Sequence, residues 1–115
     1  GGDAYLMDYN AALHGIIYKA ELECLELPTA ASNVNLDIDI RAIDANDKSY
    51  NSDSSSYRVI LNSGGDMAKG QTIESLSCVP NNGDYVYMST GASESGDATY
   101  TAGKIVIRLY GRISF

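Results

Sequence analysis

Few side chains in this sequence of 115 residues could carry acid-base or nucleophilic chemistry. His14 is the only histidine, so a Ser-His or Cys-His pair would have to include it. It lies in the stretch ALHGII, and the G-x-S-x-G pattern of a nucleophile elbow does not occur. A histidine beside a glycine at the start of a strand is typical of a turn residue with satisfied hydrogen bonds.

Paired carboxylates are the other chemistry to weigh, because two opposed acids can hydrolyse a glycosidic bond. The acids in strand-like segments are Glu21, Glu23, Asp37 and Asp39. Each alternates with apolar residues, which predicts that all four point to solvent and keep the outer sheet surfaces soluble. The sequence therefore predicts a protein that is not an enzyme.

A polar loop at residues 44–56 carries hard oxygen donors that could gather calcium. The candidate ligands are Asp44, Asp47 and Asp53. The loop lacks the glycine and glutamate that an EF-hand places at its sixth and twelfth positions. Loops also collect Asp, Asn and Ser because these side chains cap their own backbone. A weak calcium site and a plain solvated loop both stay open, and we expect no other metal or cofactor.

The net charge of the chain limits the kinds of partner that it can bind. Fifteen acidic residues against eight basic ones give a formal net charge of −7, which repels phosphate backbones and anionic lipid headgroups. No window approaches the roughly 18 to 20 apolar residues of a spanning helix. We expect neither nucleic acid nor a membrane as partner.

The two cysteines, Cys24 and Cys78, lie in apolar runs without the C-x-x-C spacing of a zinc site. We expect two reduced, buried thiols rather than a disulfide.

Alternation of apolar and polar residues predicts the strands. In residues 15–27 it places Ile16, Tyr18, Ala20, Leu22 and Cys24 on one face, followed by a slip in phase that indicates a β-bulge. Pro28 is expected to end that strand. Further strands are expected at residues 35–43, with Asp39 and Arg41 facing outward, at 57–62, within 67–79, at 85–89 and at 104–115.

Two local features refine this pattern. Asn82-Gly83 is the preferred centre of a type I′ turn, so strands should flank it directly. Residues 105–110 are apolar on both faces, which predicts that the last strand is central in its sheet. Seven to eight short strands without an amphipathic helix indicate an all-β fold. We expect one domain over residues 1–115, an antiparallel β-sandwich of jelly-roll or Greek-key type.

Two stretches resemble small virion structural proteins of tailed bacteriophages, especially those of cyanobacterial and marine hosts. They are DAYLMDYNAALHGIIYKAELECLELP near the start and YTAGKIVIRLYG near the end, and together they cover about a third of the sequence. In that family, an aromatic residue, His-Gly, an apolar pair and Tyr-Lys-Ala begin a long strand. T-A-G-K-x-x-I-R-L-Y-G closes the chain there, whereas this sequence continues with RISF.

The resemblance implies a non-enzymatic jelly-roll-like domain that decorates or cements the capsid exterior after assembly in the host cytoplasm. It implies a homotrimer whose partners are the major capsid protein or other virion proteins. The alternative in the same class is a tail-fibre or receptor-binding domain, with Tyr50 and Tyr100 as candidate platforms for a host glycan. A free lectin-like sandwich with a calcium loop is a third hypothesis.

Overall fold

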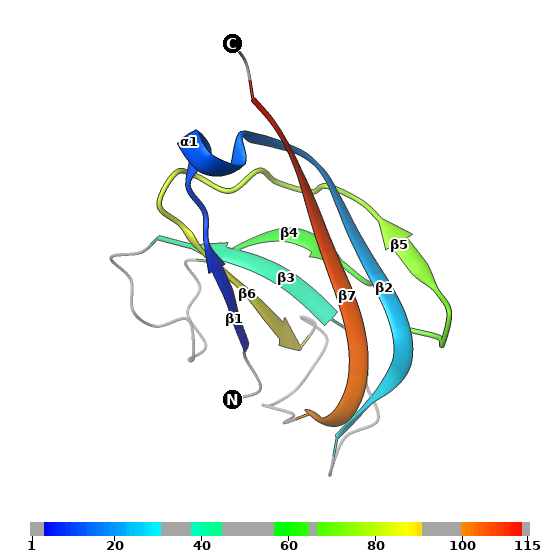
Figure 1. Cartoon of the computed structure of the whole chain (residues 1–115). Coiled ribbons are helices and arrows are strands. Elements are labelled where there is room, and N and C mark those ends of the chain that lie inside the picture. Colours follow the sequence, from blue (N-terminus) through cyan, green and yellow to red (C-terminus); the bar gives the residue numbers. More distant parts are fainter. Residues whose placement is uncertain (1–3, 31–37, 45–56, 65–66, 91–99, 114–115) are drawn as a thin grey trace.

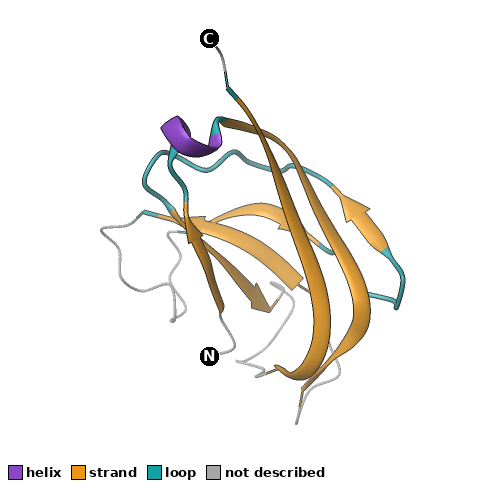
Figure 2. Ribbon diagram, viewed as in Figure 1, coloured by secondary structure: helices purple, strands orange, loops and turns teal. Residues whose placement is uncertain are grey.

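The computed structural model describes residues 4–30, 38–44, 57–64, 67–90 and 100–113. They form two antiparallel sheets (Figure 1), with strands as nearly the only regular structure (Figure 2). The strands are β1 (Ala4–Asp8), β2 (Ile16–Ala30), β3 (Ile38–Ile43), β4 (Arg58–Asn62), β5 (Thr72–Glu74), β6 (Tyr85–Thr90) and β7 (Tyr100–Arg112). The helix α1 (Ala11–His14) makes a single turn between β1 and β2. The predicted all-β sandwich of seven to eight strands is confirmed.

The four-stranded sheet has the order β1-β6-β3-β4 and the three-stranded sheet the order β5-β2-β7. Among the described strands, only β3 and β4 are both consecutive in the chain and neighbours in a sheet. The other connections cross between the sheets, so most strand pairs join segments far apart in sequence. Such non-local pairing predicts slow folding.

The core lies between the two sheets. From the three-stranded sheet, β2 contributes Ile17, Ala20, Leu22 and Cys24. The facing sheet contributes buried residues of β3, β4 and β6, namely Ile38, Ile40, Ala42, Ile60, Leu61 and Val86. Ile105, Ile107 and Leu109 of β7 pack against this core but are only partly buried.

Two irregularities in β2 decide which of its side chains reach the core. The register against β7 shifts between Ile17 and Lys19 and again between Cys24 and Glu26. The second shift confirms the bulge predicted after Cys24. The first was missed: it turns Ile17 inward and leaves Ile16 and Tyr18 exposed, so the prediction that these two face the core is wrong. Pro28 does not end the strand, because β2 continues to Ala30.

The strand β3 is covered on both faces. Asp39 was predicted to face solvent, but it is fully buried, and Arg41 retains only 12% of its side-chain exposure. Asp39 pairs with Ser89 across the ladder to β6 and with Asn62 across the ladder to β4. The second face of β3 is therefore a polar interior surface, which the alternation of charged residues did not reveal.

The turn at Asn82-Gly83 is real, but its predicted type and surroundings are wrong. The amide of Asp84 donates to the carbonyl of Asn81 at 3.0 Å, which closes a four-residue turn. Gly83 has φ 90°, whereas no described residue other than glycine has a positive φ. A positive φ at the third position alone is the type II combination, not type I′. The turn precedes β6 and lies in the crossover from β5, so it does not join a hairpin.

Two glycines allow the end of β7 to cross the junction of α1 and β2. Gly15 is buried with φ 73°, and a Cβ on it would overlap the carbonyl of Arg112. A Cβ on Gly111 would overlap the carbonyl oxygen of His14. The buried hydroxyl of Tyr9 donates to the carbonyl of Gly15 at 2.5 Å and fixes this crossing from the side of β1. These contacts fix the end of β7 against the segment that joins β1 to β2.

The last strand is not central. Among the described strands, β7 pairs with β2 alone and forms the edge of its sheet. None of its described side chains reaches full burial. Apolar residues on both faces predicted a central strand, and that inference fails here.

Candidate functional site

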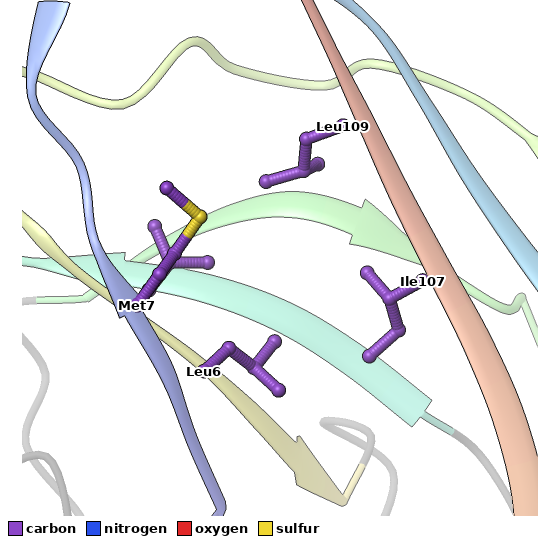
Figure 3. A pocket seen from close by; sticks show the side chains of 5 residues that line it. Leu6, Met7, Ile107 and Leu109 are labelled. Atoms are coloured by element: carbon purple, nitrogen blue, oxygen red, sulfur yellow. The ribbon is translucent and has the colours of Figure 1, made fainter. Parts of the chain in front are cut away.

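The most distinctive surface of the described molecule is an open apolar groove between the edge strands β1 and β7. Leu6 and Met7 of β1 point toward Ile107 and Leu109 of β7 (Figure 3). This part of the groove has a volume of about 280 Å³, with Val86 also in its lining. An adjoining part of about 220 Å³ extends along β7 past Ile105 to Ala102. The two sheets therefore do not close on each other along this side.

The backbone of β7 presents hydrogen-bonding groups along the same opening. On β2, the amide of Cys24 donates to Gln71 and the carbonyl of Ala20 accepts from Ser75, so both residues direct backbone groups toward the β5 side. Hydrogen-bonded and non-hydrogen-bonded pairs alternate in an antiparallel ladder. Ala20, Leu22 and Cys24 are therefore the non-hydrogen-bonded partners of Leu109, Ile107 and Ile105.

It follows that Ile105, Ile107 and Leu109 direct their N–H and C=O groups away from β2, along the open edge. Among the described strands, none pairs with this edge of β7. The residues whose side chains line the groove thus also offer their backbone groups beside it. This combination suits an added β-strand, which needs both a hydrogen-bonding edge and apolar positions.

The outer face of the three-stranded sheet is charged and internally paired. Lys19 contacts Glu21 at 3.0 Å and Glu74 at 3.5 Å. The hydrogen bond from Lys19 holds the pKa of Glu21 below its ordinary value, and the same bond raises the pKa of Lys19. Arg108 contacts Glu23 at 2.8 Å, which raises the pKa of Arg108. Glu21 and Glu23 thus face outward as predicted, and each is paired with a cation.

Asp39 forms a different kind of ion pair, inside the four-stranded sheet. Its Oδ2 accepts from Nη2 of Arg41 at 2.9 Å and from Nε at 3.1 Å, while Asn62 donates to Oδ1. The guanidinium of Arg41 lies 3.9 Å from the ring centroid of Tyr57. Burial by itself would lower the pKa of Arg41, but the hydrogen bond and charge of Asp39 raise it. A carboxylate so fully engaged stabilises charge within the protein and is poorly placed to act on a substrate.

The second buried carboxylate, Asp84, is also structural. It accepts from Nη2 of Arg58 at 2.5 Å and from the amide of Asn81 at 2.7 Å, which fixes the turn before β6. Among the described residues, no group of three or more His, Cys, Asp or Glu side chains is arranged to hold a metal ion.

Of the sequence candidates for calcium and glycan binding, only Asp44 is fully described. Asp44 is exposed at the end of β3. Tyr100 begins β7, and its side chain lies outside the described residues, as do Asp47, Tyr50 and Asp53. The calcium loop and the glycan platform therefore stay predictions. Asp37 is likewise outside the description, and Asp39 lies in a different sheet from Glu21 and Glu23.

His14 has the structural role that its sequence context predicts. Its Nδ1 accepts from the amide of Asn10 at 3.0 Å, and its ring stacks on Tyr9 with centroids 6.0 Å apart. Asn10 in turn caps α1 through the amides of Ala12 and Leu13. The ring therefore belongs to the small capped turn that leads to Gly15.

Both cysteines are free, as predicted. Cys24 is buried and Cys78 is half-buried, and burial raises the pKa of each thiol. A raised pKa leaves less thiolate at neutral pH, so neither residue is poised for nucleophilic chemistry.

None of the described helices is long and apolar enough to cross a membrane. Comparisons with protein families, curated proteins and solved structures find no match to this chain.

Sequence reasoning missed the groove. Its lining residues on β6 and β7 were assigned to strands, but no strand was predicted for Leu6 and Met7 of β1, and the incomplete burial of the lining was not foreseen. One signal was available: residues 104–112 carry three basic and no acidic side chains in a strongly acidic chain. Charged residues on a strand are one mark of a sheet edge.

Proposed function

We propose that this chain is a non-enzymatic structural protein of a bacteriophage virion, specifically a decoration protein that stabilises the head shell from outside. The open apolar edge between β1 and β7 is the observation that carries the proposal. An apolar groove beside a free strand edge is a surface for protein contact. The resemblance of the two terminal stretches to small phage virion proteins supplies the setting.

The charge supports an exterior position. A net charge of −7 is unsuited to holding packaged DNA and compatible with a place outside the shell. Stabilisation would follow from mass action, because a protein that binds only the assembled shell shifts the equilibrium toward it. The tail-fibre alternative rests on the loops with Tyr50 and Tyr100 and gains no support from the described residues.

The purified chain is expected to co-sediment with empty capsids of the phage that encodes it and to raise their disruption temperature. Leu6→Lys places a charge in the groove, so we expect capsid binding to weaken at least tenfold. Val79→Lys is the matched control, because Val79 is similarly exposed but does not line the groove. This control variant should bind as the unmodified chain does.

A chain that ignores capsids would contradict the proposal, and equal binding by the two variants would remove the groove from it. Binding to host surface polysaccharide in place of capsids would favour the receptor-binding alternative.

A further inference from the structure

The free edge of β7 lacks several of the features that keep sheet edges from pairing. Natural edges are short, interrupted by proline or distorted by bulges. β7 runs for 13 residues without proline. Between Lys104 and Arg112, each register shift against β2 places the extra residue on β2, so β7 itself stays regular. A long, regular strand edge with apolar residues beside it is a surface on which another strand can pair.

The charges on this edge are already partly neutralised within the chain. Arg108 contacts Glu21 and Glu23 of β2, and Lys104 contacts Glu26 at 3.6 Å. A second strand can therefore approach β7 without meeting a row of unbalanced cations. This removes the main electrostatic objection to pairing with a strand that is itself basic.

We propose that the partner is a second copy of the same chain, with the two β7 strands pairing antiparallel about a two-fold axis at Ile107. The inward-facing residues then match as Ile107 with Ile107 and Ile105 with Leu109 of the second copy. These residues direct their backbone groups to the open edge, so each pair exchanges N–H to C=O hydrogen bonds. The result is one continuous six-stranded sheet.

The outward-facing residues are self-complementary in this register. Val106 lies opposite Arg108 of the second copy, and Lys104 lies opposite Tyr110, as follows from their distances to Ile107 in the sequence. An aliphatic side chain then covers the stem of Arg108, and the ammonium group of Lys104 meets an aromatic ring. No like charges are directly opposed, which would be destabilising.

Other two-fold registers are less favourable. An axis at Val106 would oppose Lys104 to Arg108, and an axis at Arg108 would oppose the two arginines. An axis at Ile105 or at Leu109 would place a glycine, Gly103 or Gly111, opposite Ile107 and lose an apolar pair. Ile107 is the centre that avoids both defects.

The pairing also accounts for the groove. β1 lies on the open side of β7 (Figure 1), and the two strands share the groove lining. A strand added beside β7 continues its sheet across this opening, so inward-facing residues of the second copy cover Leu6 and Met7. By symmetry, both grooves close at once.

Cysteine cross-linking reads this register directly. Val106→Cys chains mixed with Arg108→Cys chains are expected to form an intermolecular disulfide, because residues 106 and 108 become a directly opposed, non-hydrogen-bonded pair. Each variant alone should cross-link much less, since identical positions are offset by two residues along the strand. Both variants retain Cys24 and Cys78, so each alone also controls for the native thiols. If either variant alone cross-links as much as the mixture of the two, the proposed register is wrong.

Val106→Lys tests the interface by charge. The introduced ammonium group faces Arg108 of the second copy twice in each dimer, so we expect dimerisation to weaken roughly tenfold by sedimentation equilibrium. Within its own chain the new side chain lies beside Glu23, its partner on β2, which favours retention of the fold. Val106→Thr is the neutral, similarly shaped control and should remain dimeric.

The second copy covers the groove that the proposed function assigns to the capsid, so the dimer is the state of the free protein and capsid binding displaces the second copy. The two proposals nevertheless fail separately. A dimer that ignores capsids would remove the proposed function and keep the interface. If a monomer binds capsids and gives no cross-link, the proposed function stands and the dimer interface is wrong. A three-fold trimer, as the family resemblance implies, would overturn the two-fold pairing.

Discussion

Gly111→Ala is expected to destabilise the protein by about 3 kcal/mol or more and to lower its melting temperature by roughly 10 °C or more. The added methyl group would overlap the carbonyl oxygen of His14, where β7 passes the end of α1. The obstructing atom is backbone, so no side-chain rotation relieves the overlap. Either α1 or the end of β7 must move, and β7 is held by its long ladder to β2.

Gly70→Ala is the matched control for this prediction. Gly70 has φ 83°, and a Cβ there meets no atom within 4 Å, so alanine is disfavoured only by its backbone conformation. That cost is about 1 kcal/mol. Gly111 is not among the described glycines with a positive φ, so its cost comes from overlap alone. Denaturant unfolding of both variants compares the two effects, and equal stabilities would show that the crossing is looser than described.

The alternation of side chains predicted which face of a strand is apolar. It placed Ala20, Leu22 and Cys24 of β2 on one face, which lies in the core, and it located the bulge after Cys24. These features depend on residues close in sequence, because the period of a strand is set by its own backbone. The same reasoning failed at Tyr18, where the extra residue is not marked by glycine or by a change in polarity.

Alternation does not tell which strands are neighbours. β7 was predicted to be central because Val106 and Tyr110 add apolar area to its outer face. Tyr110 instead packs beside Lys19 and near Tyr18 on an open surface. The close approach of Gly15 and Gly111 to backbone was equally invisible, since it joins segments about a hundred residues apart. The candidate site depends on such long-range placement: β7 was predicted as a strand, whereas β1 was missed and the opening between the two was not foreseen.

Asp39 shows the same limit from the polar side. A charged residue between Ile38 and Ile40 was predicted to face solvent, yet a sheet can bury its second face when polar groups there satisfy one another. Arg41, two residues along on the same face, supplies that compensation. The sequence shows that Asp39 and Arg41 share a face of the strand. It does not show whether other residues bury that face, which is what distinguishes a buried ion pair from a surface pair.

Asp39→Ala is expected to cost about 3 kcal/mol of unfolding free energy, because it leaves the guanidinium of Arg41 largely buried without its carboxylate. This value is at the low end of the destabilisation caused by breaking a buried ion pair, because Arg41 keeps some contact with solvent. Asp39→Asn keeps the side-chain volume and one acceptor oxygen, so its unfolding free energy should fall by less than that of Asp39→Ala. Chemical denaturation monitored by circular dichroism measures all three proteins.

Two further variants separate pairing from simple loss of a side chain. Glu26→Ala removes an exposed ion pair with Lys104 and should change stability little, because surface pairs contribute weakly. In the double variant Asp39→Ala with Arg41→Leu, the stranded charge is gone, so the loss should be smaller than the sum of the two single losses. Additive losses would show that Asp39 and Arg41 act independently, and the polar face of β3 would then have to be stabilised by its other contacts.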